Sequence, residues 1–190
     1  MDDLLNKITD FGDDAHGEQL RKYAPDRYMV HPKRVMQTLR NYTDDITILA
    51  AALLHDVLED TRVSKGEMRD FLARLLGREK AERTLDLVVD LTDVYVKTEY
   101  PKLNRRTRKA KELERLEKTS PDSQTIKYAD ILDNTLEITD HDPDFARVYL
   151  QEVSHILKKL DKGNSELRQR AEMAVNDGIK KLGGSKGARS

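Results

Sequence analysis

The chain has 190 residues, of which 37% are hydrophobic and 36% are charged, and this length allows one domain with a sizeable core. Its 34 basic and 35 acidic residues leave a formal net charge of −1, so it lacks the basic excess typical of nucleic-acid-binding proteins and we expect no such partner. The absence of cysteine excludes disulfide bonds, thiolate zinc sites and cysteine nucleophiles.

The sequence shows no signal for export or for a membrane. Its first residues, MDDLLNKI, lack the basic and apolar regions of a signal peptide. The longest apolar run, residues 48–54, is too short to span a bilayer. We therefore expect a cytoplasmic protein with no membrane partner.

Apolar residues recur every three or four positions along nearly the whole chain, as they do on one face of a helix. No segment has the alternating pattern of a strand. The expected helices are residues 2–17, 32–39, 46–54, 64–76, 79–92, a basic helix that begins after Leu103, 121–136, 143–160 and 165–182.

Several helix starts carry local signals. Pro32 sits where a helix can begin, and either Asp44 or Asp45 can cap the next one. Ser64 and Glu67 form a capping-box pattern. The helix over residues 46–54 is apolar on nearly all sides, which predicts a buried central helix.

The pattern as a whole predicts a single all-α domain over residues 1–182. The polar, glycine-containing residues 183–190 are expected to be a disordered tail. The last helix carries a series of apolar positions that could either close the core or face a second copy in a homo-oligomer. These positions are Leu167, Ala171, Ala174, Val175, Ile179 and Leu182.

The most informative segment closes the central apolar run. His55 and Asp56 are followed one helical turn later by Glu59 and Asp60. If the segment is helical, spacings of three and four residues place these side chains on one surface. Several carboxylates beside an apolar segment are costly to bury unless a cation compensates them. A metal site is therefore the first hypothesis.

Two further residues complete a plausible ligand set. His31 precedes Pro32, and Asp130 lies on an otherwise apolar helix. Two imidazoles and two carboxylates suit a first-row divalent ion such as manganese, iron or zinc. The alternatives are that His31 only enters a helix and that Asp130 pairs with a buried cation. For Glu59 and Asp60 the alternative is a solvated helix end.

Three sequence blocks in order make the chain similar to the HD-domain phosphohydrolases, and more narrowly to the alarmone hydrolase domain of the RelA/SpoT homologues. The blocks are AHGEQLRK (15–22) continuing to YMVHP (28–32), AAALLHDVLEDT (50–61) and IKYADILDN (126–134). The resemblance covers about residues 1–160, implies an HD-domain helical bundle, and has the length of the stand-alone small hydrolases. It departs from the family at residues 23–27, and the loop over 94–103 is variable.

The resemblance implies manganese-dependent removal of the 3′-pyrophosphate from guanosine tetra- or pentaphosphate. One divalent ion, with iron or zinc as other candidates, would bind the ligands His31, His55, Asp56 and Asp130. Glu59 and Asp60 would orient and deprotonate the attacking water. The substrate would meet Arg21 on its base, Lys22 on phosphate, and Asn134 on its ribose or phosphate end.

A basic cluster before and within the helix after Leu103 offers further phosphate contacts, or else a solvated helix face. Its members are Lys97, Lys102, Arg105, Arg106 and Lys109. Two other functions stay open. The same metal chemistry could act on another phosphorylated nucleotide, such as the 2′-phosphate of NADPH, or the pocket could belong to a nucleotide-binding regulator without turnover.

Overall fold

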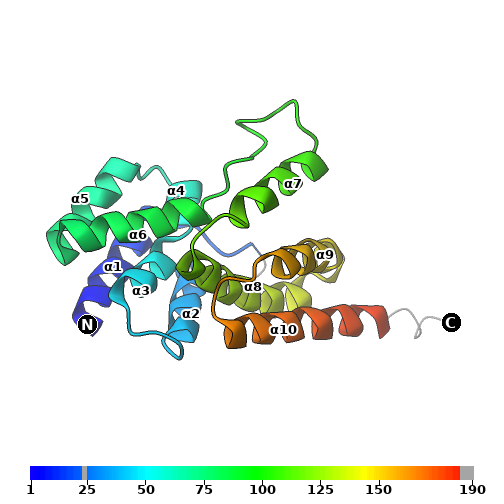
Figure 1. Cartoon of the computed structure of the whole chain (residues 1–190). Coiled ribbons are helices and arrows are strands. Elements are labelled where there is room, and N and C mark those ends of the chain that lie inside the picture. Colours follow the sequence, from blue (N-terminus) through cyan, green and yellow to red (C-terminus); the bar gives the residue numbers. More distant parts are fainter. Residues whose placement is uncertain (23–24, 185–190) are drawn as a thin grey trace.

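The computed structural model describes residues 1–22 and 25–184, and it folds them into ten helices with no strand (Figure 1). The only extended pairing among these residues is an isolated antiparallel bridge between Leu20 and Arg27. The expected all-α class is confirmed. The helices are α1 (Asp2–His16), α2 (Val30–Leu39), α3 (Ile46–Leu54), α4 (Val57–Asp60), α5 (Lys65–Leu76), α6 (Arg78–Leu91), α7 (Arg105–Leu116), α8 (Pro121–His141), α9 (Pro143–Lys159) and α10 (Ser165–Gly184).

Helix α3 is the centre of the first half of the fold. It packs against α1, α2, α6 and α8, and every residue from Thr47 to Leu54 is buried. A helix with apolar side chains on all sides can only be stable when neighbours enclose it, so the sequence of α3 requires this central position. The expected buried helix is confirmed.

Helix α8 is the second centre. It packs against α2, α3 and α6 on one side and against α9 and α10 on the other. In Figure 1, α2, α3 and α6 are labelled to the left of α8. Leu167, Ala171, Val175 and Leu182 of α10 are buried within the chain. These positions therefore close the core, although Ile179 stays exposed. None of the helices in the described ranges is long and apolar enough to cross a bilayer.

Three boundaries differ from the expectation. Helix α2 begins at Val30, two residues before Pro32, because proline is tolerated in the first turn, whose N–H groups have no partner within the helix. Helix α8 continues to His141, five residues past the expected end at residue 136. Helix α3 has the expected bounds, and a separate turn, α4, begins at Val57. Helix α10 continues to Gly184, past the expected end at residue 182. The rest of the expected tail, residues 185–190, lies outside the described residues, as do residues 23 and 24 of the departure from the family.

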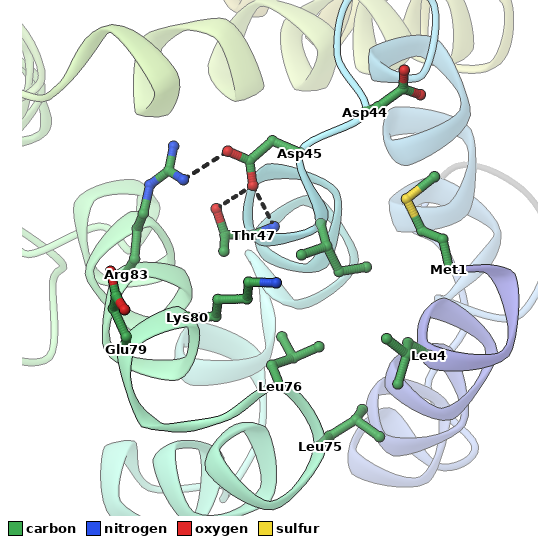
Figure 2. A pocket seen from close by; sticks show the side chains of 11 residues that line it. Met1, Leu4, Asp44, Asp45, Thr47, Leu75, Leu76, Glu79, Lys80 and Arg83 are labelled. Carbon is green, nitrogen blue, oxygen red and sulfur yellow. Dashed lines mark hydrogen bonds and ion pairs between the residues drawn. The ribbon is translucent and has the colours of Figure 1, made fainter.

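The first turn of α3 borders a hollow of about 660 Å³ between α1, α5 and α6. Asp45 caps α3 there by accepting a hydrogen bond from the backbone N–H of Thr47 at 2.9 Å. Its other carboxylate oxygen lies 2.6 Å from Nη1 of Arg83 on α6 (Figure 2). Arg83 also contacts Asp122 in the first turn of α8. Asp45, and not Asp44, is thus the cap, and it links α3 to α6.

Replacing Asp45 with alanine should lower the free energy of unfolding by about 1–2 kcal/mol, because the cap of the central helix is lost and the exposed pair with Arg83 adds little. The matched control is Asp44→Ala, which removes the neighbouring carboxylate and should change stability by less than about 0.5 kcal/mol. Urea denaturation followed by circular dichroism measures both. Equal losses in the two variants would contradict this role for Asp45.

Candidate metal centre and substrate pocket

The four expected ligands come from four different places in the fold and meet at one point. His31 lies on α2, His55 follows α3, Asp56 precedes α4 and Asp130 lies on α8. Nε2 of His31 is 3.2 Å from Oδ1 of Asp130, and Nε2 of His55 is 3.2 Å from Oδ2 of Asp56. The two cross distances, His31 to Asp56 and His55 to Asp130, are 3.9 and 3.8 Å.

His55 and Asp56 lie at the junction between α3 and α4. The backbone stays in the right-handed helical region at both residues, and the carbonyl of Asp56 accepts the N–H groups of Glu59 and Asp60 at 3.2 and 2.9 Å. The end of α3 and the start of α4 thus present both side chains to the centre.

Both imidazoles are held by their far nitrogens. Nδ1 of His31 lies 2.6 Å from the carboxylate of Asp133, and Nδ1 of His55 lies 2.8 Å from the carbonyl oxygen of Ala52. Acceptors at Nδ1 leave the Nε2 atoms to face the centre, as in metal-binding histidines. Nε2 of His55 is buried without a hydrogen-bond partner among the described residues. This donor set fits a divalent cation.

The charges at the centre depend on each other. Burial alone would lower the pKa of His55, but the carboxylates of Asp56 and Asp130 raise it to about 9. The pKa of His31 is also raised, against its burial, by Asp130 and Asp133. Burial opposes the charge of Asp130, yet Lys127 and the imidazoles hold its pKa well below the usual value. The carboxylates thus attract positive charge, which a metal cation can supply in place of protons.

A pocket of about 970 Å³ opens from this centre between α7, α8 and α9, a size typical of small-molecule sites. The wall formed by α9 is mostly apolar and aromatic, with Glu152 and His155 as its polar members. Its apolar and aromatic residues are Phe145, Val148, Tyr149, Val153 and Ile156. Helix α7 contributes the cations Arg105, Arg106 and Lys109, together with Ala110, Glu112, Leu113 and Leu116. The pocket therefore combines an apolar, aromatic surface with cationic side chains.

Glu59 and Asp60 occupy different positions. Glu59 lines the pocket and accepts a hydrogen bond from the backbone N–H of Asp93 at 3.0 Å. Partial removal from water raises the pKa of Glu59 to about 7, with help from the charges of Asp93 and Asp56. Asp60 is not one of the described residues that line the pocket, and its carboxylate interacts with the hydroxyl of Tyr28.

Arg21 and Asn134 line the pocket but are bonded within the protein. Asn134 donates to Asp130 at 2.5 Å and accepts from Nη2 of Arg21 at 2.8 Å. Arg21 also pairs with Glu137 at 2.5 Å, and its side chain is only 7% exposed. The guanidinium carbon lies 5.4 Å from the ring centre of Tyr28. These two residues thus join the pocket to the metal centre.

The other expected substrate contacts divide into two groups. Arg105 lines the pocket and forms an ion pair with Glu152 of α9 at 2.8 Å. Lys22, Lys97 and Lys102 are not among the described residues that line it. The ammonium group of Lys22 lies 4.7 Å from the ring centre of Phe145, and Lys97 and Lys102 lie on the exposed segment before α7.

Three residues of the centre were missed by sequence reasoning. Tyr28 donates its hydroxyl to Asp56 at 2.9 Å, Lys127 donates to Asp130 at 2.8 Å, and Asp133 holds His31. Lys127 and Asp133 lie three residues on either side of Asp130, so helical spacing could have identified them. Tyr28 carried no comparable signal, because its contact with Asp56 joins two distant segments.

Comparisons with known proteins agree with this geometry. The HD domain family matches residues 28–135, a range that contains all four expected ligands. The mouse and human proteins named guanosine-3′,5′-bis(diphosphate) 3′-pyrophosphohydrolase MESH1 are each 30% identical over 173 residues, covering 87% of this chain and 89% of theirs. A Mycoplasma pneumoniae protein, named as a probable enzyme of the same kind, is 29% identical over 141 residues. The match covers 71% of this chain and 18% of that longer relative.

Solved structures show the same fold. A structure described as a metazoan ortholog of SpoT that hydrolyzes ppGpp has a TM-score of 0.73 at 24% identity, covering 95% of this chain and 96% of that one. A Listeria monocytogenes protein has a TM-score of 0.56 at 23% identity, covering 79% and 94%. From the family match, the MESH1 relatives and the shared fold, we conclude that this chain belongs to the HD domain family.

Proposed function

We propose that this protein is a manganese-dependent hydrolase that removes the 3′-pyrophosphate from guanosine tetra- or pentaphosphate, giving GDP or GTP and pyrophosphate. The proposal rests on one observation above all: two imidazoles and two carboxylates meet at the inner end of a pocket whose outer walls are aromatic and cationic. The names of the MESH1 relatives support this substrate.

His31, His55, Asp56 and Asp130 are the residues that would hold the metal. Their nitrogen and oxygen donors suit manganese, and iron and zinc accept the same set. When bound, a divalent cation would supply a Lewis acid and lower the pKa of a coordinated water. Lys127, fixed by Asp130, adds positive charge where the phosphoryl group would react.

Hydrolysis breaks the bond between the 3′ oxygen and phosphorus. The attacking water loses a proton and the 3′ oxygen gains one. With a pKa of about 7, Glu59 can both accept a proton near neutral pH and return it afterwards. We propose Glu59 as the general base and Asp60 as a residue that orients the site through Tyr28.

The pocket walls suggest how the nucleotide would lie. We propose that the guanine base packs on the aromatic wall of α9 and that the phosphates face the cations of α7. Of the eight candidates from the sequence, five line the pocket, which supports them as substrate contacts: Arg21, Asn134, Arg105, Arg106 and Lys109. Lys22, Lys97 and Lys102 remain candidates for longer-range attraction of a polyanion.

The purified protein with Mn²⁺ should convert ppGpp to GDP and pyrophosphate, and both EDTA and Asp56→Ala should abolish the reaction. Anion-exchange chromatography follows the products. If folded, Mn²⁺-loaded protein gave no product, the assignment of ppGpp as the substrate would be wrong. In that case release of phosphate from NADPH would identify the alternative reaction, and nucleotide binding without turnover would identify a regulator.

Replacing Glu59 with glutamine should lower kcat by about 100- to 10,000-fold, because the base is lost while the shape of the pocket is kept. The affinity for Mn²⁺ and the KM should change little. Glu79→Gln, which alters an exposed glutamate beside the distant hollow, is the matched control and should leave kcat unchanged. A variant Glu59→Gln with wild-type kcat would rule out Glu59 as the base.

The affinity for Mn²⁺ should rise as the pH increases from 6 to 9, with protons released on binding. The reason is that the carboxylates raise the pKa values of His31 and His55 in the metal-free protein, and only neutral imidazole binds metal. By the same linkage, the contribution of these protonated imidazoles to stability is complete below pH 6.5 and is lost toward pH 9. Calorimetric titration in buffers of different ionisation enthalpy measures the released protons. A pH-independent affinity would contradict this linkage.

A further inference from the structure

A ring of side chains connects two of the candidate ligands, Asp130 and His31, through hydrogen bonds that lie outside the metal centre. It runs from Asp130 to Asn134, Arg21, Glu137, Arg34, Asp133 and His31, with distances of 2.5, 2.8, 2.5, 2.8, 2.7 and 2.6 Å for successive steps. His31 Nε2 then returns to Asp130 at 3.2 Å. Each member thereby limits the freedom of the next.

The ring uses one face of α8. Asp133 and Asn134 each lie three or four residues from both Asp130 and Glu137, which places the four residues along one stripe of the helix. Across from this stripe stand His31 and Arg34, also three residues apart, on α2. The packing of α2 on α8 thus brings the candidate ligand His31 next to Asp133, its hydrogen-bond partner.

Asp133 is the member with the most direct effect on a ligand. Its side chain is 12% exposed, and Arg34 grips both of its oxygens, Nε at 2.7 Å and Nη2 at 2.9 Å. This two-point contact fixes the plane of the carboxylate. The oxygen of Asp133 that faces His31 can therefore hold the imidazole in one orientation.

Stability alone is a weak explanation for this arrangement. Ion pairs shielded from water lose much of their attraction to the cost of dehydration, and apolar residues of the same size are often equally stable. Apolar residues could not orient an imidazole, however. The contrast with His55, which is held by the backbone carbonyl of Ala52, shows that His31 depends on a side chain for its orientation.

We propose that Asp133, clamped by Arg34, is a positioning residue that aims Nε2 of His31 at the divalent cation and strengthens it as a donor. This inference rests on the metal centre of the proposed function. Asp133 is not among the described residues that line the pocket, so it acts only through His31. Loss of a residue that hydrogen-bonds a metal-binding histidine typically weakens metal binding by about 10- to 100-fold.

The test measures Mn²⁺ binding by calorimetry in the full chain, without substrate. Asp133→Asn, which keeps size but removes the charge, should weaken binding at least tenfold with little change in Tm. Asp140→Asn is the matched control, since Asp140 lies on the same helix, is exposed and pairs with Lys181 outside the ring. It should bind Mn²⁺ like the wild type.

Arg34→Lys provides a second variant if Asp133→Asn does not fold. Lysine keeps the charge but cannot grip both oxygens, so binding should weaken, though less than in Asp133→Asn. If the wild type binds Mn²⁺ and both ring variants bind it equally well, the positioning role is wrong while the metal centre stands. If the wild type itself binds no Mn²⁺, the metal centre fails and this inference fails with it.

Discussion

Two carboxylates and two imidazoles share a space only a few ångströms wide, and the rest of the structure is arranged around the charge that they need. Asp56 and Asp130 cannot both stay ionised away from water without nearby positive charge. In the metal-free chain the imidazoles and Lys127 provide it. A divalent cation would supply this positive charge and could also coordinate a phosphate group. The need for positive charge beside Asp56 and Asp130 thus explains both the raised pKa values of the imidazoles and the fit to a divalent cation.

The fold meets this requirement by bringing rigid elements to one point. Helix α3 is enclosed by its neighbours and gives a fixed base for His55, and Asp56 reaches the same point from the start of α4. Helix α8 supplies Asp130 from the opposite side. A ligand placed at a helix junction is held more firmly than one on a long loop, which suits a site that must keep its shape as the metal binds.

The pocket shows why the bulk charge of the chain says little about its ligand. The net charge is −1, yet the wall of α7 gathers several cations opposite an aromatic surface. Many of these cations are paired, as Arg105 is with Glu152 and Lys109 with Asp93. A polyphosphate with several negative charges could compete for such partners. Attraction for a nucleotide is therefore a local property that an average over the chain conceals.

The sequence by itself determined the helical class, the buried central helix, the capping box at Ser64 and the four residues that meet at the metal centre. These features follow from periodicity and from short motifs, which depend only on the spacing of residues along the chain. It could not show the early start of α2, the extension of α8 to His141 or the cap at Asp45 in place of Asp44, since these depend on packing. Nor could it show that Asp133 holds His31, that Arg21 is bonded to Glu137, or that Tyr28 reaches Asp56. Those contacts join residues 28 to 116 positions apart, and only the tertiary structure decided them because helix packing alone sets which distant side chains meet.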